Sequence, residues 1–135
     1  MVKGYNHIGI CVFSIDETAA WFGRTLGAEL LYKKEYPERH QVSAMLELKD
    51  GSRIELMEPL GEGGTVNGFL EKKGQGIHHL SLKVDDLDAA CRQFEEAGGK
   101  IIGRASGIAF VHPKTAYGCL LELSDGSFGK SDPSA

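Results

Sequence analysis

The sequence predicts an α+β fold made of two copies of one unit, in which a strand, a helix and three further strands follow one another. Three observations lead to this prediction. Segments with the two-residue alternation of strands stand beside segments with the helical spacing of apolar residues. The same order of segments occurs again in the second half of the chain. Each half also ends on a strand in which one glutamate stands between two apolar residues.

The length and composition are those of one globular domain. The chain has 135 residues, of which 41% are hydrophobic and 25% are charged, close to the averages for globular proteins. The expected organisation is a single domain over residues 1–135, with a first module at about 4–60, a linker and short helix at about 61–75, a second module at about 76–124 and a polar tail at 125–135.

The charge balance and the cysteines exclude several classes of function. A formal net charge of −4 argues against a nucleic-acid surface, which needs clustered Lys and Arg. No apolar run is long enough to span a bilayer, and the first residues lack the apolar core of a secretion signal, so we expect a cytoplasmic protein without membrane partners. Cys11, Cys91 and Cys119 form no C-x-x-C pair and are expected to be reduced and buried.

The first module begins with a strand at 6–12, where apolar side chains alternate with small or polar ones. A helix is predicted at 15–26. Ser14 and Glu17 have the spacing of a capping box at its start, and Gly27 ends it. Trp21 and Phe22 within this helix are expected to pack in the core. Three strands are then predicted, at 29–33, 42–48 and 53–58, the last two joined by a tight turn at Lys49-Asp50-Gly51-Ser52.

The second module repeats this order. A strand is predicted at 79–84, Asp86 can cap a helix at 87–97, and Gly98 and Gly99 end that helix. Three strands follow, at 100–103, 108–112 and 119–123.

The two modules correspond residue by residue. His7 and His79 are 72 positions apart (79 − 7), and Gly27 and Gly99 have the same separation. Ile54-Glu55-Leu56 corresponds to Leu121-Glu122-Leu123 at an offset of 67 (122 − 55). Each module therefore begins with a histidine and ends with a glutamate.

These four equivalent residues predict a metal site. Because neighbours on a strand point to opposite faces, Glu55 and Glu122 lie opposite the apolar residues that flank them. A carboxylate buried without a partner would be costly. A lone strand histidine or glutamate is usually structural or solvated, but four of them at repeated positions favour ligation. His7, Glu55, His79 and Glu122 are therefore the expected ligands of one divalent ion, with Co, Zn, Ni, Mn or Fe(II) as candidates.

At this point the sequence resembles the vicinal oxygen chelate superfamily, which includes glyoxalase I, fosfomycin-resistance enzymes, extradiol dioxygenases, bleomycin-binding proteins and methylmalonyl-CoA epimerase. The resemblance covers residues 5–124. Within the superfamily the epimerases are the nearest match, through the strings Asn6-His7-Ile8, Ile54-Glu55-Leu56-Met57-Glu58-Pro59-Leu60-Gly61, Gly76-Ile77-His78-His79, Val84-Asp85-Asp86, Phe110-Val111-His112-Pro113-Lys114 and Leu121-Glu122-Leu123.

The resemblance implies two βαβββ modules that form a cupped, barrel-like mixed sheet around one metal ion, and a homodimer. It also implies an isomerase that abstracts the proton α to the carbonyl of an acyl-CoA thioester through a metal-stabilised enolate. Glu122 matches a proposed base of the family. The sequence departs from the family in having Ser43 or Ala44 where a second glutamate base is usual, and in having a shorter segment at Arg104–Gly107. Glu47, on the same predicted strand as Ser43, is the substitute candidate for that base.

Two other functions remain open from the sequence. One is a glyoxalase I-like lyase, or a detoxification enzyme that depends on glutathione or another thiol. The other is a ligand-binding protein without catalysis. The complete set of four ligands favours chemistry over binding alone, because binding-only members of the superfamily commonly lack it.

Overall fold

The computed structural model describes residues 1–128, and it divides the chain into two compact units. Among the described residues, the module-one unit is formed by Ile8–His78, and the module-two unit by Met1–His7 together with residues 79–128. Strands β1 (Val2–Cys11) and β5 (Gly76–Val84) contribute residues to both units. Most of the polar tail predicted at 125–135 lies outside the described residues.

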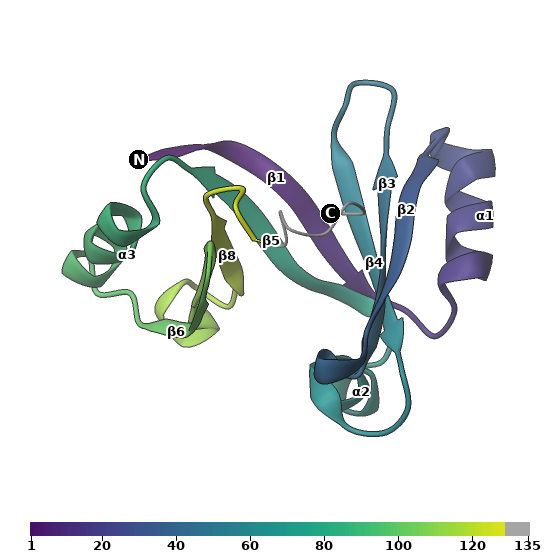
Figure 1. Ribbon diagram of the computed structural model, residues 1–135. Coiled ribbons are helices and arrows are strands. Elements are labelled where there is room, and N and C mark those ends of the chain that lie inside the picture. Colours follow the sequence, from purple (N-terminus) through teal and green to yellow (C-terminus); the bar gives the residue numbers. More distant parts are fainter. Residues whose placement is uncertain (129–135) are drawn as a thin grey trace. The chain divides into compact units, whose positions relative to one another are not determined.

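The module-one unit is a mixed sheet with a helix on one face (Figure 1). Its strands have the order β2-β3-β4-β1, in which β1 and β4 are parallel and the other pairs are antiparallel. Helix α1 (Ile15–Leu26) packs on apolar side chains of three strands, among them Val42, Leu46 and Leu56. The remaining strands are β2 (Glu29–Tyr36), β3 (Gln41–Glu47) and β4 (Arg53–Pro59), with a 3₁₀ turn, η1 (Pro37–Arg39), between β2 and β3.

A second helix of this unit, α2 (Gly64–Lys73), packs on a different group of side chains. Its Val66 and Leu70 are buried together with Cys11 and Met57. Since Cys11 and Met57 directly follow Ile10 and Leu56 along their strands, they point to the sheet face opposite α1. The segment predicted to hold a linker and a short helix thus contains α2, which belongs to the module-one unit.

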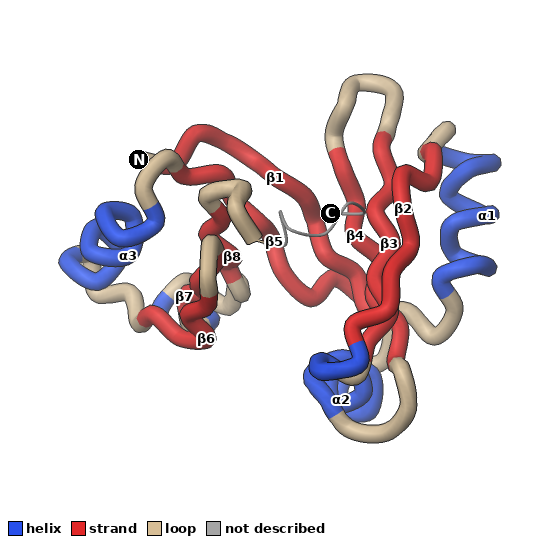
Figure 2. Tube along the Cα trace, viewed as in Figure 1, coloured by secondary structure: helices blue, strands red, loops and turns tan. Residues whose placement is uncertain are grey.

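The module-two unit repeats this design. Its strands have the order β5-β8-β7-β6, with β5 and β8 parallel and the other pairs antiparallel. Helix α3 (Leu87–Glu96) packs through Leu87, Ala90 and Cys91 on apolar residues of the sheet. The strands are β6 (Ile101–Ala105), β7 (Ile108–Val111) and β8 (Leu121–Ser124), and the 3₁₀ turn η2 (Pro113–Thr115) precedes β8. Figure 2 shows the helices and strands of each unit by colour.

The observed elements confirm the α+β class and the two βαβββ modules. The side chain of Ser14 accepts a hydrogen bond from the backbone N–H of Glu17 at 3.1 Å, and Gly27 ends α1 in the left-handed region at φ 67°. Asp86 caps α3 in the same way, through the N–H of Ala89. None of the helices among the described residues is long and apolar enough to cross a membrane.

Two predictions about the core are wrong. Trp21 is 54% exposed, and only its neighbour Phe22 packs against the core. Cys119 is exposed as well, whereas Cys11 and Cys91 are buried. Strand β8 begins at Leu121, so Cys119 belongs to the turn before it, where Tyr117 and Gly118 have positive φ angles.

These different environments predict selective reactivity of the three thiols. Burial, followed by the nearby charge of Glu55, raises the pKa of Cys11 to about 11, and burial also raises the pKa of Cys91. Because the thiolate is the reactive form, a thiol reagent at pH 8 is expected to titrate one cysteine rapidly in the native protein and three after denaturation. Cys119→Ser should abolish the rapid phase. A native protein in which two or three thiols react rapidly would contradict the burial.

Candidate metal centre

The register of the parallel strands places histidine and glutamate on one face. In the module-two unit Ser81 is opposite Glu122, and His79 precedes Ser81 by two residues, so all three side chains share a face of the sheet. In the module-one unit Gly9 is opposite Glu55. Gly9 and Ser81 are 72 positions apart (81 − 9), so the pairing confirms the repeat found in the sequence.

Three of the four predicted ligands come together in the module-two unit. The Nε2 atoms of His7 and His79 are 3.0 Å apart, and Nε2 of His7 is 3.8 Å from Oε1 of Glu122. One donor atom from each residue lies within 4.8 Å of the other two. The side chains of His7 and Glu122 are only 10% and 11% exposed, and His79 is 4% exposed. The cluster is therefore largely removed from solvent.

Hydrogen bonds hold two of these side chains in place. Nδ1 of His7 lies 3.0 Å from Oδ1 of Asn6, and this contact fits a tautomer in which Nδ1 carries the proton and Nε2 presents its lone pair. The hydroxyl of Ser81 donates to Oε1 of Glu122 at 2.7 Å. The ring of Phe110 stands edge-on to the ring of His79, with 6.1 Å between centroids.

The donor set and its spacing fit a divalent ion. Two nitrogens bonded to one ion at about 2.1 Å lie about 3.0 Å apart at a right angle and about 3.4 Å apart at the tetrahedral angle. The observed separation of 3.0 Å between the imidazole nitrogens matches the first value. Imidazole nitrogen with carboxylate oxygen suits Zn, Co, Ni, Mn and Fe(II). His7, His79 and Glu122 would hold the ion.

The fourth predicted ligand, Glu55, belongs to the module-one unit, and its role as a ligand stays a prediction. Within that unit it lies between Gly9 and Met45 on the neighbouring strands. Its charge contributes to raising the pKa of Tyr32 to about 12, an effect due first to burial. Burial lowers the pKa of His78, and the negative charge of Glu55 acts in the opposite direction. The His78 ring packs edge-on to the ring of Phe69. This agrees with a structural role for His78.

Glu47, the candidate second base, ends β3 in the module-one unit. Its carboxylate forms an ion pair with Arg53 at 3.3 Å, and its side chain is 36% exposed. Ser43, which together with Ala44 stands near the position of the usual family glutamate, is 3% exposed and accepts a hydrogen bond from Nε2 of Gln41. Ser43 and Glu47 share a strand face with Met45, the residue opposite Glu55. They are about 13 Å apart along the strand.

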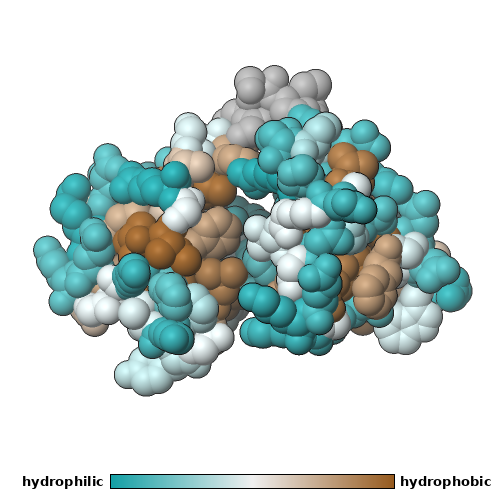
Figure 3. All heavy atoms as spheres, turned by 90° about the horizontal axis from the view of Figure 1, so that it is seen from below, coloured by the Kyte–Doolittle hydropathy of each residue, from teal (hydrophilic) through white to brown (hydrophobic). Residues whose placement is uncertain are grey.

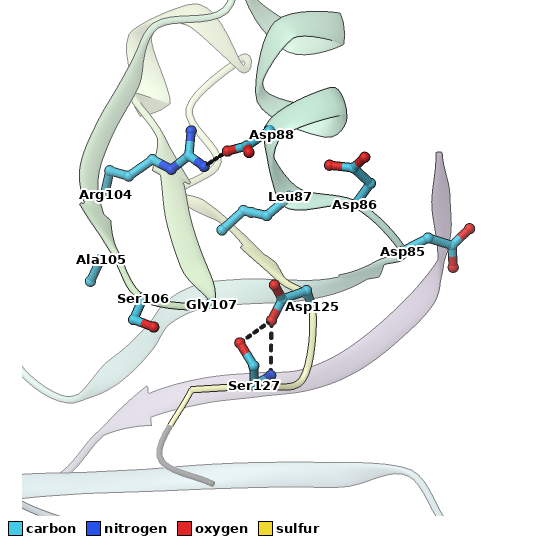
Figure 4. A pocket seen from close by; sticks show the side chains of 10 residues that line it. All are labelled: Asp85, Asp86, Leu87, Asp88, Arg104, Ala105, Ser106, Gly107, Asp125 and Ser127. Carbon is cyan, nitrogen blue, oxygen red and sulfur yellow. Dashed lines mark hydrogen bonds and ion pairs between the residues drawn. The ribbon is translucent and has the colours of Figure 1, made fainter.

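A surface pocket in the module-two unit has none of the predicted ligands in its lining (Figure 4). Its lining is rich in aspartates, which have partners of their own. Asp88 forms an ion pair with Arg104, and Asp125 accepts hydrogen bonds from Ser127. The segment Arg104–Gly107 is short because β6 and β7 are joined by a tight turn. Gly107 has φ 83° in this turn, and a Cβ atom there would lie 2.6 Å from the backbone nitrogen of Phe128.

Sequence reasoning missed two residues of the centre, Asn6 and Ser81. Asn6 stands beside a predicted ligand, and a polar residue next to a strand histidine is a weak signal. Ser81 offered a better one, since it is the second-module equivalent of Gly9 and shares the face of His79.

The sequence is similar to a known protein family and to individual enzymes. The family model described as the glyoxalase/bleomycin resistance protein/dioxygenase superfamily matches residues 6–117. The ethylmalonyl-CoA/methylmalonyl-CoA epimerase of Cereibacter sphaeroides is 37% identical over 132 residues, which cover 91% of this chain and 98% of that protein.

Solved structures give the same relation. A crystal structure of methylmalonyl-CoA epimerase from Mycobacterium tuberculosis has a TM-score of 0.81 and 34% identity, and the match covers 91% of this chain and 87% of that one. A methylmalonyl-CoA epimerase in complex with methylmalonyl-CoA and NH₄⁺ has a TM-score of 0.79 and 31% identity, with coverage of 91% and 94%.

Proposed function

Since the chain belongs to the glyoxalase/bleomycin resistance protein/dioxygenase superfamily, we propose that it is a metal-dependent epimerase of 2-methylmalonyl-CoA or a closely related acyl-CoA thioester. The observation that carries the proposal is the 37% identity to an ethylmalonyl-CoA/methylmalonyl-CoA epimerase along nearly the full length of both chains. The cluster of His7, His79 and Glu122 supports it.

Epimerisation at C2 of such a thioester removes the α proton from one face and returns a proton to the other, through an enolate. When bound, a divalent ion supplies a Lewis acid that stabilises the negative charge of the enolate. Glu122 is the proposed base on one face, because its carboxylate lies at the ligand cluster, and it would take the proton on loosening from the ion. His7 and His79 orient the site, and the burial of the cluster excludes water from it. Glu55 is the proposed fourth ligand.

The second face needs its own proton donor and acceptor. Ser43 has no carboxylate to offer, so Glu47 is the proposed substitute. Its ion pair with Arg53 has to open before Glu47 can take part in proton transfer. We therefore expect the contribution of Glu47 to the rate to be smaller than that of Glu122.

The test is deuterium incorporation from solvent. Metal-loaded protein is incubated with methylmalonyl-CoA in D₂O, and the mass of the thioester is followed. Deuterium at C2 above the level of a metal-free control is the expected result. If that exchange is absent while a glutathione hemithioacetal is turned over, the glyoxalase-like alternative replaces the epimerase. If neither compound reacts, methylmalonyl-CoA and the hemithioacetal are both excluded as substrates, and the ligand-binding alternative gains support.

The chain is also proposed to form a homodimer. β2 and β6 stand at the ends of the strand orders of the two units, and uncovered strand edges favour pairing or coverage. Apolar patches interrupt the hydrophilic surface in Figure 3, and Leu30 on β2 is 54% exposed. Light scattering at micromolar concentration should give twice the mass of one chain, and the mass of a single chain would contradict the dimer.

A cytoplasmic location remains the proposal made from the sequence. The three free cysteines are compatible with a reducing compartment.

A further inference from the structure

The two repeated glutamates meet different residues on the neighbouring strand. Glu122 is opposite Ser81, whose hydroxyl donates a hydrogen bond to it, whereas Glu55 is opposite Gly9, which has no side chain. Gly9 and Ser81 are equivalent positions of the repeat, so only the carboxylate of the second module has a hydroxyl at this position of the parallel neighbouring strand.

Ser81 is placed so that its hydroxyl has a defined direction. Its side chain is fully buried, with 0% exposure, and it lies on a strand between His79 and Lys83. The separation of 2.7 Å between its Oγ and Oε1 of Glu122 is in the range of a hydrogen bond from a hydroxyl to a charged acceptor. Oε1 is also the atom that lies 3.8 Å from Nε2 of His7.

We propose that Ser81 is a positioning residue of the metal site, whose hydroxyl holds the carboxylate of Glu122 in the orientation in which it meets the two imidazoles. The inference rests on the proposed function, because it concerns the ion that the epimerase would use. A carboxylate has a rotatable terminal bond, and a donor fixed by the strand restricts that rotation. Such outer partners of metal ligands commonly contribute 10- to 100-fold to metal affinity.

The proposal assigns different tasks to the two carboxylates. Glu122 is held by a neighbouring strand and keeps one orientation as a ligand. Gly9, the residue opposite Glu55, has no hydroxyl. Glu55 therefore receives no hydrogen bond from this position that would orient it as a ligand. The difference between Gly9 and Ser81 thus makes the surroundings of the two repeated carboxylates unequal.

The test measures Co²⁺ binding to the full chain by competition with a chromophoric chelator. Ser81→Ala and Ser81→Gly both remove the hydroxyl, and Ser81→Gly introduces the residue that stands at the equivalent position 9 of the first module. Both are expected to raise the dissociation constant about tenfold or more and to change the visible absorption spectrum of bound Co²⁺, which reports the geometry of the ligands.

The matched control is Ser124→Ala. Ser124 is also a buried serine of the module-two sheet, but its hydroxyl accepts from the backbone N–H of Gly126. It should leave the Co²⁺ affinity and spectrum unchanged. Thermal unfolding of each variant with chelator present identifies any change that is only structural.

The outcomes distinguish a failure of the positioning role of Ser81 from a failure of the metal site. If Ser81→Ala or Ser81→Gly binds Co²⁺ with the affinity and spectrum of the wild type, the role of Ser81 is overturned while the metal site stands. The same holds if both variants only lose thermal stability without a change in affinity. If the wild type itself binds no Co²⁺, the metal site fails and the positioning role fails with it.

Discussion

His7→Ala and Glu122→Ala are each expected to lower the metal content from about one divalent ion per chain to less than about a tenth of that value. The reason is geometric. The described cluster offers two imidazole nitrogens and one carboxylate, so loss of one donor leaves two in the cluster, with Glu55 as the one further proposed ligand, and the ion is then expected to be lost on desalting. Elemental analysis of protein purified with added metal and then desalted measures the content.

A matched histidine variant controls for unspecific effects. His40 is exposed, outside the cluster, and has a positive φ angle of 55°, a conformation that asparagine tolerates. His40→Asn should keep the full metal content. Added metal should also raise the unfolding temperature of the wild type and of His40→Asn, but not of His7→Ala, because only a folded state that binds the ion is stabilised. Full metal retention in both ligand variants would refute the site.

The affinity for the metal ion, measured by competition with a chelator, decides the role of Glu55. If it is the fourth ligand predicted from the repeat, Glu55→Ala should lower the affinity for the ion, and Glu55→Gln, which keeps an oxygen donor, should lower it less. An unchanged affinity in both variants would leave a site with three protein ligands.

Much of the fold and of the site follows from local sequence signals. Strand alternation and the capping residues Ser14 and Asp86 locate the elements, because both act within a few residues. The separation of 72 positions between His7 and His79 reveals the repeat, and the repeat identifies the ligand candidates.

What the sequence did not predict depends on contacts between distant segments. The hydrogen bond from Ser81 to Glu122 requires the register of two parallel strands, which alternation within one strand does not give. The predicted strand at 119–123 includes Cys119, although the chain is still turning at Tyr117 and Gly118. Trp21 and Phe22 are adjacent in a helix and point about 100° apart, so only Phe22 packs against the core.

The largest expected effect on catalysis is that of Glu122→Gln on proton exchange. In metal-loaded wild type the α proton of methylmalonyl-CoA should exchange with D₂O. Gln keeps an oxygen that can face the ion but cannot accept the proton, and a positioned base typically contributes about 10²- to 10⁴-fold to a rate. We therefore expect Glu122→Gln to reduce exchange at least about 10²-fold, measured at saturating metal so that weaker binding of the ion does not account for the loss.

Glu47→Gln should have a smaller effect, less than about tenfold, because Glu47 is bound to Arg53 and lies away from the position of the usual second base. Glu96→Gln, at an exposed position on α3, serves as the control and should exchange at the wild-type rate. If Glu47→Gln exchanges the α proton at the wild-type rate, water or another group serves the second face. Exchange should then run faster than inversion at C2. Chiral analysis of the thioester measures the inversion. If Glu122→Gln at saturating metal exchanges as fast as the wild type, Glu122 is a ligand and not the base.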